Sequence, residues 1–169
     1  MEELIIPEQP KEIHPLKHMF VSDEIAKELY RLGFDEPCFA YYSLSHTGDD
    51  YGFYVVGEYT HYRDFYSNYV GHGLSNSELQ RNPTGRLKQC FVAPLYQQVI
   101  DWLAEKHNKY IYAFRYDGKW QYKIDAEHGC DYFSVVEGCS DRYTALTQGI
   151  LYLLKDMRLG DFIVSNIKL

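Results

Sequence analysis

Residues 110–124 read YIYAFRYDGKWQYKI and carry the clearest structural signal in the chain. An Asp-Gly pair between two stretches of alternating apolar residues is typical of a two-residue β-hairpin turn. Asp117-Gly118 therefore predicts a hairpin that joins a strand over 110–116 to a strand over 119–124. In the second strand, large apolar side chains alternate with Lys and Gln, so one face is predicted to be core and the other exposed to water.

Two predicted helices flank this hairpin, and a third strand over 131–137 follows it. The first helix starts at Pro94, which suits the first helical position, and ends at Asn108, which tolerates a left-handed cap. The second starts after Ser140 as N-cap. Gly149 in that helix costs about 1 kcal/mol relative to alanine, and we expect it to mark close approach to a strand. The apolar stripes are Leu95, Val99, Trp102 and Leu103 in the first helix, and Tyr143, Leu146, Ile150, Leu153, Leu154 and Met157 in the second.

The N-terminal half predicts a helix and a second hairpin. Residues 1–20 carry three prolines and are expected to be an extended lead-in. Ser22 is the predicted N-cap of the following helix, and Gly33 and Phe34 fit the left-handed end of a Schellman motif. Strands over 38–45 and 51–58 form the hairpin, and residues 161–169 predict a final edge strand.

Residues 57–91 form an irregular, aromatic-rich segment. A capping box over Ser75 to Glu78 predicts one short helix in it. The whole pattern predicts an α+β protein with an antiparallel sheet and helices packed on one face, in the order α-β-β-(irregular)-α-β-β-β-α. A chain of 169 residues fits a single domain over 1–169.

Composition narrows the classes of function. The chain has a formal net charge of −7, and an acidic chain repels the phosphate backbone, so nucleic-acid binding is disfavoured. The 17 tyrosines favour either half-exposed strands or an adhesive face for another protein. No signal peptide or membrane span is predicted, and no membrane partner.

The cysteines are predicted to be free thiols rather than a metal site or a set of disulfides. Cys38, Cys90, Cys130 and Cys139 include no C-x-x-C pair, and no histidine lies at zinc-finger spacing from them. Burial of Cys38, Cys90 and Cys130 is expected, because they lie in or beside apolar strand-like segments. Free thiols without an export signal predict a cytoplasmic protein. No cofactor is predicted.

Three stretches resemble an uncharacterised family of small α+β proteins found in gut anaerobes and in their phages and mobile elements. They are residues 33–42 (GFDEPCFAYY), Ala93-Pro94 with the helix that ends at 102–108 (WLAEKHN), and the helix that opens at 143–146 (YTAL). The family has no assigned activity, so the resemblance implies an accessory role and no catalytic residues.

The C-terminal α-β-β-β-α order also resembles the topology of double-stranded-RNA-binding domains. Those domains use basic residues near the start of their last helix to reach phosphates. In this chain the corresponding residues are Asp141-Arg142-Tyr143, without a lysine cluster. The resemblance is therefore one of topology.

Candidate site residues lie mainly in the irregular segment. His61 and Asp64 would share one face of a helix, and with His72 they are weak candidates for a metal or acid–base site. His128 and Cys130 are a further candidate for a reactive thiol. An interaction face is predicted at the tyrosines of the same segment: Tyr59, Tyr62, Tyr66 and Tyr69.

The leading hypothesis is a non-enzymatic protein-interaction module with another protein as partner. Serine nucleophile elbows, phosphate-binding glycine loops and H-E-x-x-H helices are absent from the sequence, which disfavours an enzyme. The second hypothesis is a small enzyme or small-ligand binder with its site near residues 57–91. The third is a nucleic-acid binder.

Overall fold

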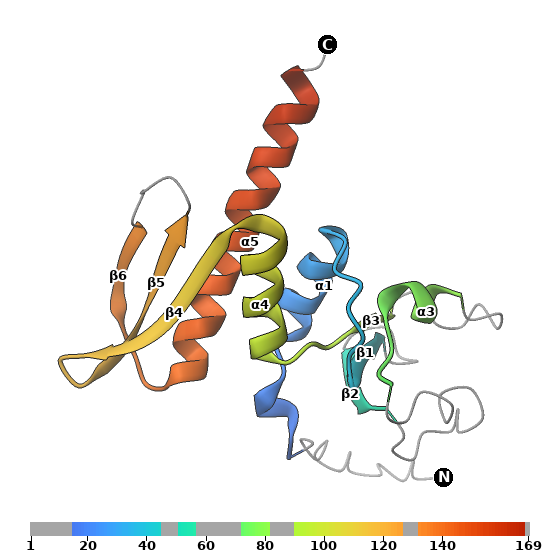
Figure 1. Cartoon of the computed structure of the whole chain (residues 1–169). Helices are drawn as coiled ribbons and strands as arrows, with labels where there is room; N and C mark the ends of the chain where they lie inside the picture. Colours follow the sequence, from blue (N-terminus) through green and yellow to red (C-terminus); the bar gives the residue numbers. More distant parts are fainter. Residues whose placement is uncertain (1–14, 45–50, 57–71, 82–89, 127–131, 168–169) are drawn as a thin grey trace, which may run out of the picture.

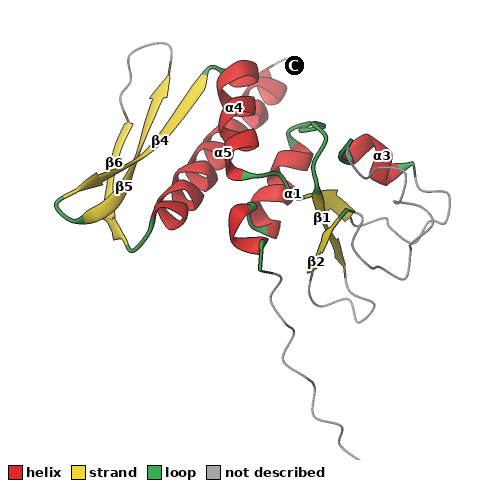
Figure 2. Ribbon diagram, turned by 60° about the horizontal axis from the view of Figure 1, so that its bottom comes forward, coloured by secondary structure: helices red, strands yellow, loops and turns green. Residues whose placement is uncertain are grey.

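The computed structural model describes residues 15–44, 51–56, 72–81, 90–126 and 132–167. In these ranges helices are mixed with two small antiparallel sheets of three strands each, an α+β fold as predicted (Figures 1 and 2). The order is η1 (Lys17–Met19), α1 (Asp23–Arg31), β1 (Ala40–Leu44), β2 (Tyr51–Val55), α3 (Asn76–Gln80), β3 (Cys90–Val92), α4 (Tyr96–His107), β4 (Lys109–Tyr116), β5 (Lys119–Ala126), β6 (Tyr132–Cys139) and α5 (Arg142–Ile167).

The two sheets differ in how far apart their strands lie in the sequence. The C-terminal sheet has the order β4-β5-β6, so each strand pairs with its neighbour in the chain. The N-terminal sheet has the order β2-β1-β3, and β3 reaches β1 from the far side of the irregular segment, with Tyr42 opposite Phe91. The predicted order of elements is therefore confirmed, but the strands divide between two sheets.

Helix α1 has both predicted ends. The Ser22 hydroxyl accepts a hydrogen bond from the Ile25 N–H at its start. At its end Gly33 has φ +84°, the Phe34 N–H donates to the Leu29 carbonyl (2.9 Å), and the Gly33 N–H donates to the Tyr30 carbonyl (3.1 Å). This pair of bonds is the Schellman motif. It turns the chain back so that Phe34 is buried against Trp102 of α4.

A short helix, α3, lies within the predicted irregular segment and is held by side-chain hydrogen bonds. The Ser75 and Glu78 side chains form the predicted capping box. Asn76 at its first position is buried and bonds to two other segments: its Nδ2 donates to the Phe34 carbonyl (2.6 Å), and its Oδ1 accepts from the Val92 N–H (3.0 Å). One amide side chain thus connects α3 to the end of α1 and to β3.

Helix α4 begins two residues later than predicted. Leu95 is its N-cap, and the Gln98 side chain accepts from the Leu95 N–H (3.0 Å). Pro94 precedes the helix, and its carbonyl accepts a hydrogen bond from the Val21 N–H (3.0 Å). Within the first helical turn this carbonyl would point along the helix axis and could not reach Val21. The predicted left-handed end is confirmed, since Asn108 has φ 51°.

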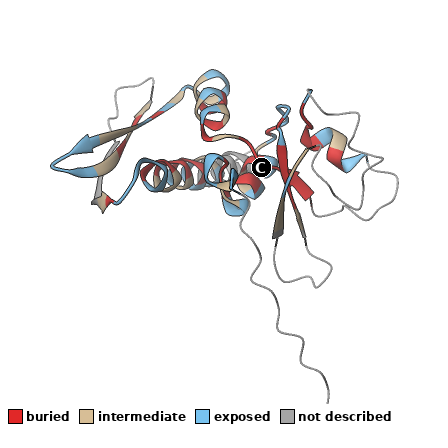
Figure 3. Cartoon of the chain, turned by 90° about the horizontal axis from the view of Figure 1, so that it is seen from below, coloured by how far each residue is buried: buried red, intermediate tan, exposed pale blue. Residues whose placement is uncertain are grey.

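The apolar residues of both halves form one core. It includes Ile25 and Leu29 of α1, Tyr42 of β1 and Val99 and Trp102 of α4, and it continues to α5 through Leu146, Ile150, Leu153 and Leu154. Helix α5 packs against β4, β5 and β6 and also against α1, where Arg158 and Glu28 form an ion pair of 3.8 Å. Figure 3 shows buried segments, in red, on α4 and α5 and on the strands of the N-terminal sheet.

Helix α5 is longer than predicted and has a different cap. It runs to Ile167, so the predicted edge strand over 161–169 is wrong, and its last turns extend beyond the body of the molecule (Figure 1). A helix that is already formed lengthens by one hydrogen bond per residue, and each of its two interior glycines, Gly149 and Gly160, costs only about 1 kcal/mol. In the described part of the chain, no helix combines the length and the apolar character needed to cross a bilayer.

Asp141, rather than Ser140, caps α5. Its carboxylate accepts from the Thr144 N–H (2.9 Å) and the Thr144 hydroxyl (2.6 Å), and these bonds lower the pKa of Asp141. We expect Asp141→Ala to lower the free energy of unfolding by about 1 kcal/mol near neutral pH. Because the pKa is lowered in the folded state, the cap contributes fully above the ordinary carboxyl value of 3.8 and is lost as the pH falls below it.

Urea titration of the wild type and of Asp141→Ala at pH 7 and pH 3 measures this effect. Asp141→Asn serves as the control, because asparagine caps a helix as well as aspartate does without titrating. A difference between wild type and Asp141→Ala that is as large at pH 3 as at pH 7 would contradict the assignment.

Candidate interaction face

The turn between β4 and β5 sets the register of the C-terminal sheet. Asp117 and Gly118 have φ values of 47° and 75°, the left-handed pair that a type I′ turn requires. Tyr116 therefore lies opposite Lys119, and the pairing continues without a shift to Lys109 opposite Ala126. Side chains at alternate positions of both strands consequently fall on opposite faces of the sheet.

Helix α5 covers one of these faces. Ile111 is buried on β4, and Tyr122 and Ile124 are buried on β5. A Cβ atom added to Gly149 of α5 would lie 2.5 Å from the Ile111 Cδ1 and 2.8 Å from the Tyr122 ring. The close approach predicted at Gly149 is thus confirmed, and it identifies the inner face of the sheet.

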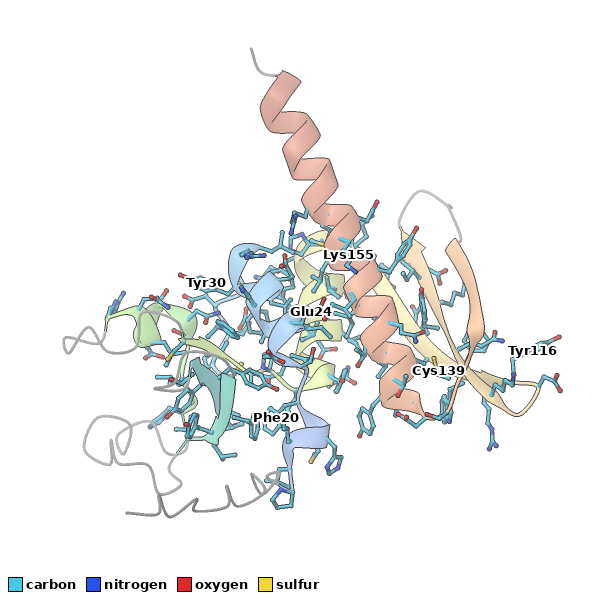
Figure 4. All side chains as sticks on the ribbon, turned by 180° about the vertical axis from the view of Figure 1, so that it is seen from behind. Phe20, Glu24, Tyr30, Tyr116, Cys139 and Lys155 are labelled. Atoms are coloured by element: carbon cyan, nitrogen blue, oxygen red, sulfur yellow. The ribbon has the colours of Figure 1, made fainter. Side chains whose placement is uncertain are left out.

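The opposite face is aromatic and exposed, and we call it the tyrosine face. Tyr110, Tyr112 and Tyr116 are 39%, 50% and 66% exposed. Figure 4 shows Tyr116 extending away from the body of the molecule near the β4–β5 turn. The tyrosine face comprises Tyr110, Tyr112, Phe114 and Tyr116 of β4 and the residues opposite them on β5, Asp125, Lys123, Gln121 and Lys119.

The polar half of the tyrosine face carries little net charge. The Lys123 Nζ and an Asp125 carboxylate oxygen are 2.8 Å apart, so these two charges offset each other. Lys119 adds one positive charge beside the exposed Tyr116. The face therefore presents tyrosine rings and hydroxyl groups bordered by lysine and glutamine, held on a two-stranded ladder.

The residues predicted as a site in 57–91 fall mostly outside the described residues. Tyr59, Tyr62, Tyr66, Tyr69, His61 and Asp64 all do so, as do His128 and Cys130. His72 is described and lies exposed in a turn before Gly73. The described ranges hold no group of three His, Cys, Asp or Glu side chains placed to bind a metal.

The described cysteines are unsuited to thiol chemistry. Cys38, Cys90 and Cys139 are buried and free. Burial, with a smaller effect from Glu36, raises the pKa of Cys38 to about 12, and burial also raises the pKa of Cys90 and of Cys139. A nucleophilic cysteine needs a lowered pKa and access to solvent, so these thiols are structural.

Searches of protein-family models, curated proteins and solved structures find no match to this chain. The described C-terminal elements follow the order α4-β4-β5-β6-α5. Asp141 caps α5, and Arg142 is the only cation in the first turn of that helix. The class that the geometry defines is therefore an α+β protein with an exposed aromatic sheet face.

Proposed function

We propose that the chain is a non-enzymatic protein-interaction module and that the tyrosine face is its docking surface. The observation that carries the proposal is the exposure of Tyr110, Tyr112 and Tyr116 on one rigid strand. A large exposed aromatic cluster is unfavourable in water unless it serves a contact. The resemblance to proteins of phages and mobile elements suggests a host protein as the partner.

The chemistry of the face favours a polypeptide partner. Tyrosine supplies a large contact area with only two side-chain torsions to immobilise, and its hydroxyl can bond to a partner's backbone. Tyr112 lies near the middle of the face, flanked by Tyr110 and Phe114, which is the position where binding energy concentrates in interfaces. Stacking of bases on these rings is the alternative, but Lys119 is the only cation on the face without a carboxylate beside it, and the net charge is −7.

We expect the double substitution Tyr112→Ala and Tyr116→Ala to weaken binding of the partner at least tenfold. Affinity capture from a cell extract identifies the bound protein, and calorimetry with that purified protein then measures the dissociation constant. Both tyrosines are exposed, so the melting temperature should change little.

Tyr30→Ala on α1 is the matched control, because Tyr30 is 40% exposed and lies away from the sheet (Figure 4). It should leave the dissociation constant unchanged. Equal affinity for the double variant and the wild type would refute the proposal. Capture of a nuclease-sensitive species that the double variant no longer retains would replace it with nucleic-acid binding.

A further inference from the structure

We infer that the free edge of β4 pairs with β4 of a second copy of this chain, so that the two C-terminal sheets join into one. This inference goes beyond the proposed function and does not depend on it: the dimer is formed by the backbone edge of β4, although side chains of the tyrosine face lie beside one another across it. Three features of β4 support it: the backbone groups that point to its open edge, the charges along the strand, and its exposure.

The turn determines which backbone groups of β4 face the open edge. In a two-residue hairpin the closing pair, Tyr116 and Lys119, exchanges both of its backbone hydrogen bonds. Alternation then directs the N–H and C=O groups of Ile111, Ala113 and Arg115 away from β5. Strand β4 is the last strand of its sheet, and no described residue bonds to these outward groups. An edge of this kind is a template for another strand.

The edge is also accessible. Beyond its first residues β4 leads away from the end of α4, and the β4–β5 turn stands clear of the helices (Figures 1 and 3). Tyr112, Arg115 and Tyr116 are exposed. A partner strand can therefore approach along most of β4.

The sequence of β4 is complementary to itself when two copies run antiparallel about a two-fold axis at Ala113. This register places Lys109 of each copy opposite Asp117 of the other, so the two-fold axis creates two equivalent pairs of opposite charge. It also places Tyr112 opposite Phe114 and Tyr110 opposite Tyr116, and aromatic pairs of this kind stabilise adjacent strands. All outward backbone groups between 109 and 117 find partners in it.

Charge disfavours the register whose two-fold axis lies at Tyr112. A shift of the axis to Tyr112 keeps the same hydrogen-bonding phase but sets Lys109 opposite Arg115 of the other copy, again twice. Like charges directly opposite each other destabilise a strand pair. The charges of Lys109, Arg115 and Asp117 thus favour the register at Ala113.

Sedimentation equilibrium of the full chain up to high micromolar concentration tests the inference. We expect a weak, concentration-dependent dimer, as is usual for a small interface. Lys109→Glu should lower its association constant about tenfold, since two attractions become two repulsions. Asp117→Asn, which the left-handed turn tolerates, should restore much of that loss in the Lys109→Glu background and weaken the dimer in the wild type.

Rescue of Lys109→Glu by Asp117→Asn would show that the two residues interact between two copies of the chain. Lys109 is the first residue of β4 and Asp117 is the turn residue that follows its last one. They are about 26 Å apart along an extended strand, which is too far for coupling within one chain. Ala113→Pro is the second variant: it removes an outward N–H and leaves the β4–β5 ladder intact, so it should abolish the dimer. A wild type that stays monomeric, or Lys109 and Asp117 effects that simply add, would overturn the inference. In that case the effect of the tyrosine variants on partner binding could still be measured, so the dimer and the docking surface can be refuted separately.

Discussion

Replacement of Asn76 by alanine is expected to lower the free energy of unfolding by about 3 kcal/mol. The Asn76 side chain is 4% exposed and satisfies the Phe34 carbonyl and the Val92 N–H. Alanine would leave both backbone groups buried without a partner. Chemical denaturation monitored by circular dichroism measures the loss.

The neighbouring Ser77 provides the control for this substitution. Its N–H and hydroxyl bond to the Asp35 carboxylate, but the site is exposed, so water replaces the lost hydroxyl bond in Ser77→Ala and the cost should stay below about 1 kcal/mol. Asn76→Asp keeps the acceptor for Val92 but sets a charge against the Phe34 carbonyl, and it should destabilise the fold as well. Similar unfolding energies for Asn76→Ala and Ser77→Ala would show that Asn76 does not connect α1 to β3.

Substitution of Gly149 by alanine is expected to lower the free energy of unfolding by about 2 kcal/mol, although alanine has a higher helix propensity than glycine. Propensity alone predicts a gain of about 1 kcal/mol in the middle of α5. The added Cβ would lie 2.5 Å from the Ile111 Cδ1 and 2.8 Å from the Tyr122 ring, and overpacking costs about 1–3 kcal/mol. The contact with Tyr122 decides the sign, because that ring is buried within the sheet.

Ile111→Val tests the cause of this loss, because it removes the Cδ1 atom nearest to the added Cβ. Alone it should cost about 1 kcal/mol. The double variant Ile111→Val and Gly149→Ala should lose clearly less stability than the sum of the two single losses. Thermal unfolding in a double-mutant cycle measures this difference. Strict additivity would place the strain of Gly149→Ala elsewhere than at Ile111.

Features that depend on a few adjacent residues could be predicted from the sequence. The Schellman end at Gly33, the turn at Asp117 and the left-handed cap at Asn108 all require φ above zero, which only certain residues adopt at low cost. The burial of Tyr122 and the exposure of Lys119, on opposite faces of β5, followed from alternation alone. In each case the chemistry of one position excludes other local conformations.

Features that depend on distant residues could not be predicted. The β1–β2 hairpin of the N-terminal sheet was predicted, but its third strand was not. Strand β3 is only three residues long and pairs with β1 from a distant part of the sequence, so no local pattern indicates it. Ser140 and Asp141 are both good caps, and the choice between them depended on which carboxylate or hydroxyl reached Thr144. The last turns of α5 carry apolar residues that suit a strand or a helix equally well.

The tyrosine face was visible in the sequence only indirectly. Strand β4 carries apolar residues on both sides, with Ile111 and Ala113 between Lys109 and Arg115 on one side and aromatic residues on the other. Its own pattern therefore does not identify the aromatic side as the one that meets water. Strand β5 identifies the exposed side. The turn places Tyr116 opposite Lys119 and Tyr112 opposite Lys123, and because lysines are rarely buried, the tyrosines on the same face are expected to be exposed to water. Prediction of the docking surface in residues 57–91 stays untested, because those tyrosines lie outside the described residues.

The contact of α5 with α1 has a consequence for biosynthesis. Glu28 lies in α1 and Arg158 in α5, far apart in the sequence, so the part of α1 that α5 covers stays exposed until α5 has been synthesised. Until then the nascent chain presents this apolar surface unshielded, a situation in which chains depend on chaperones. Closure by one long helix thus makes the synthesis of α5 decisive for the fate of α1.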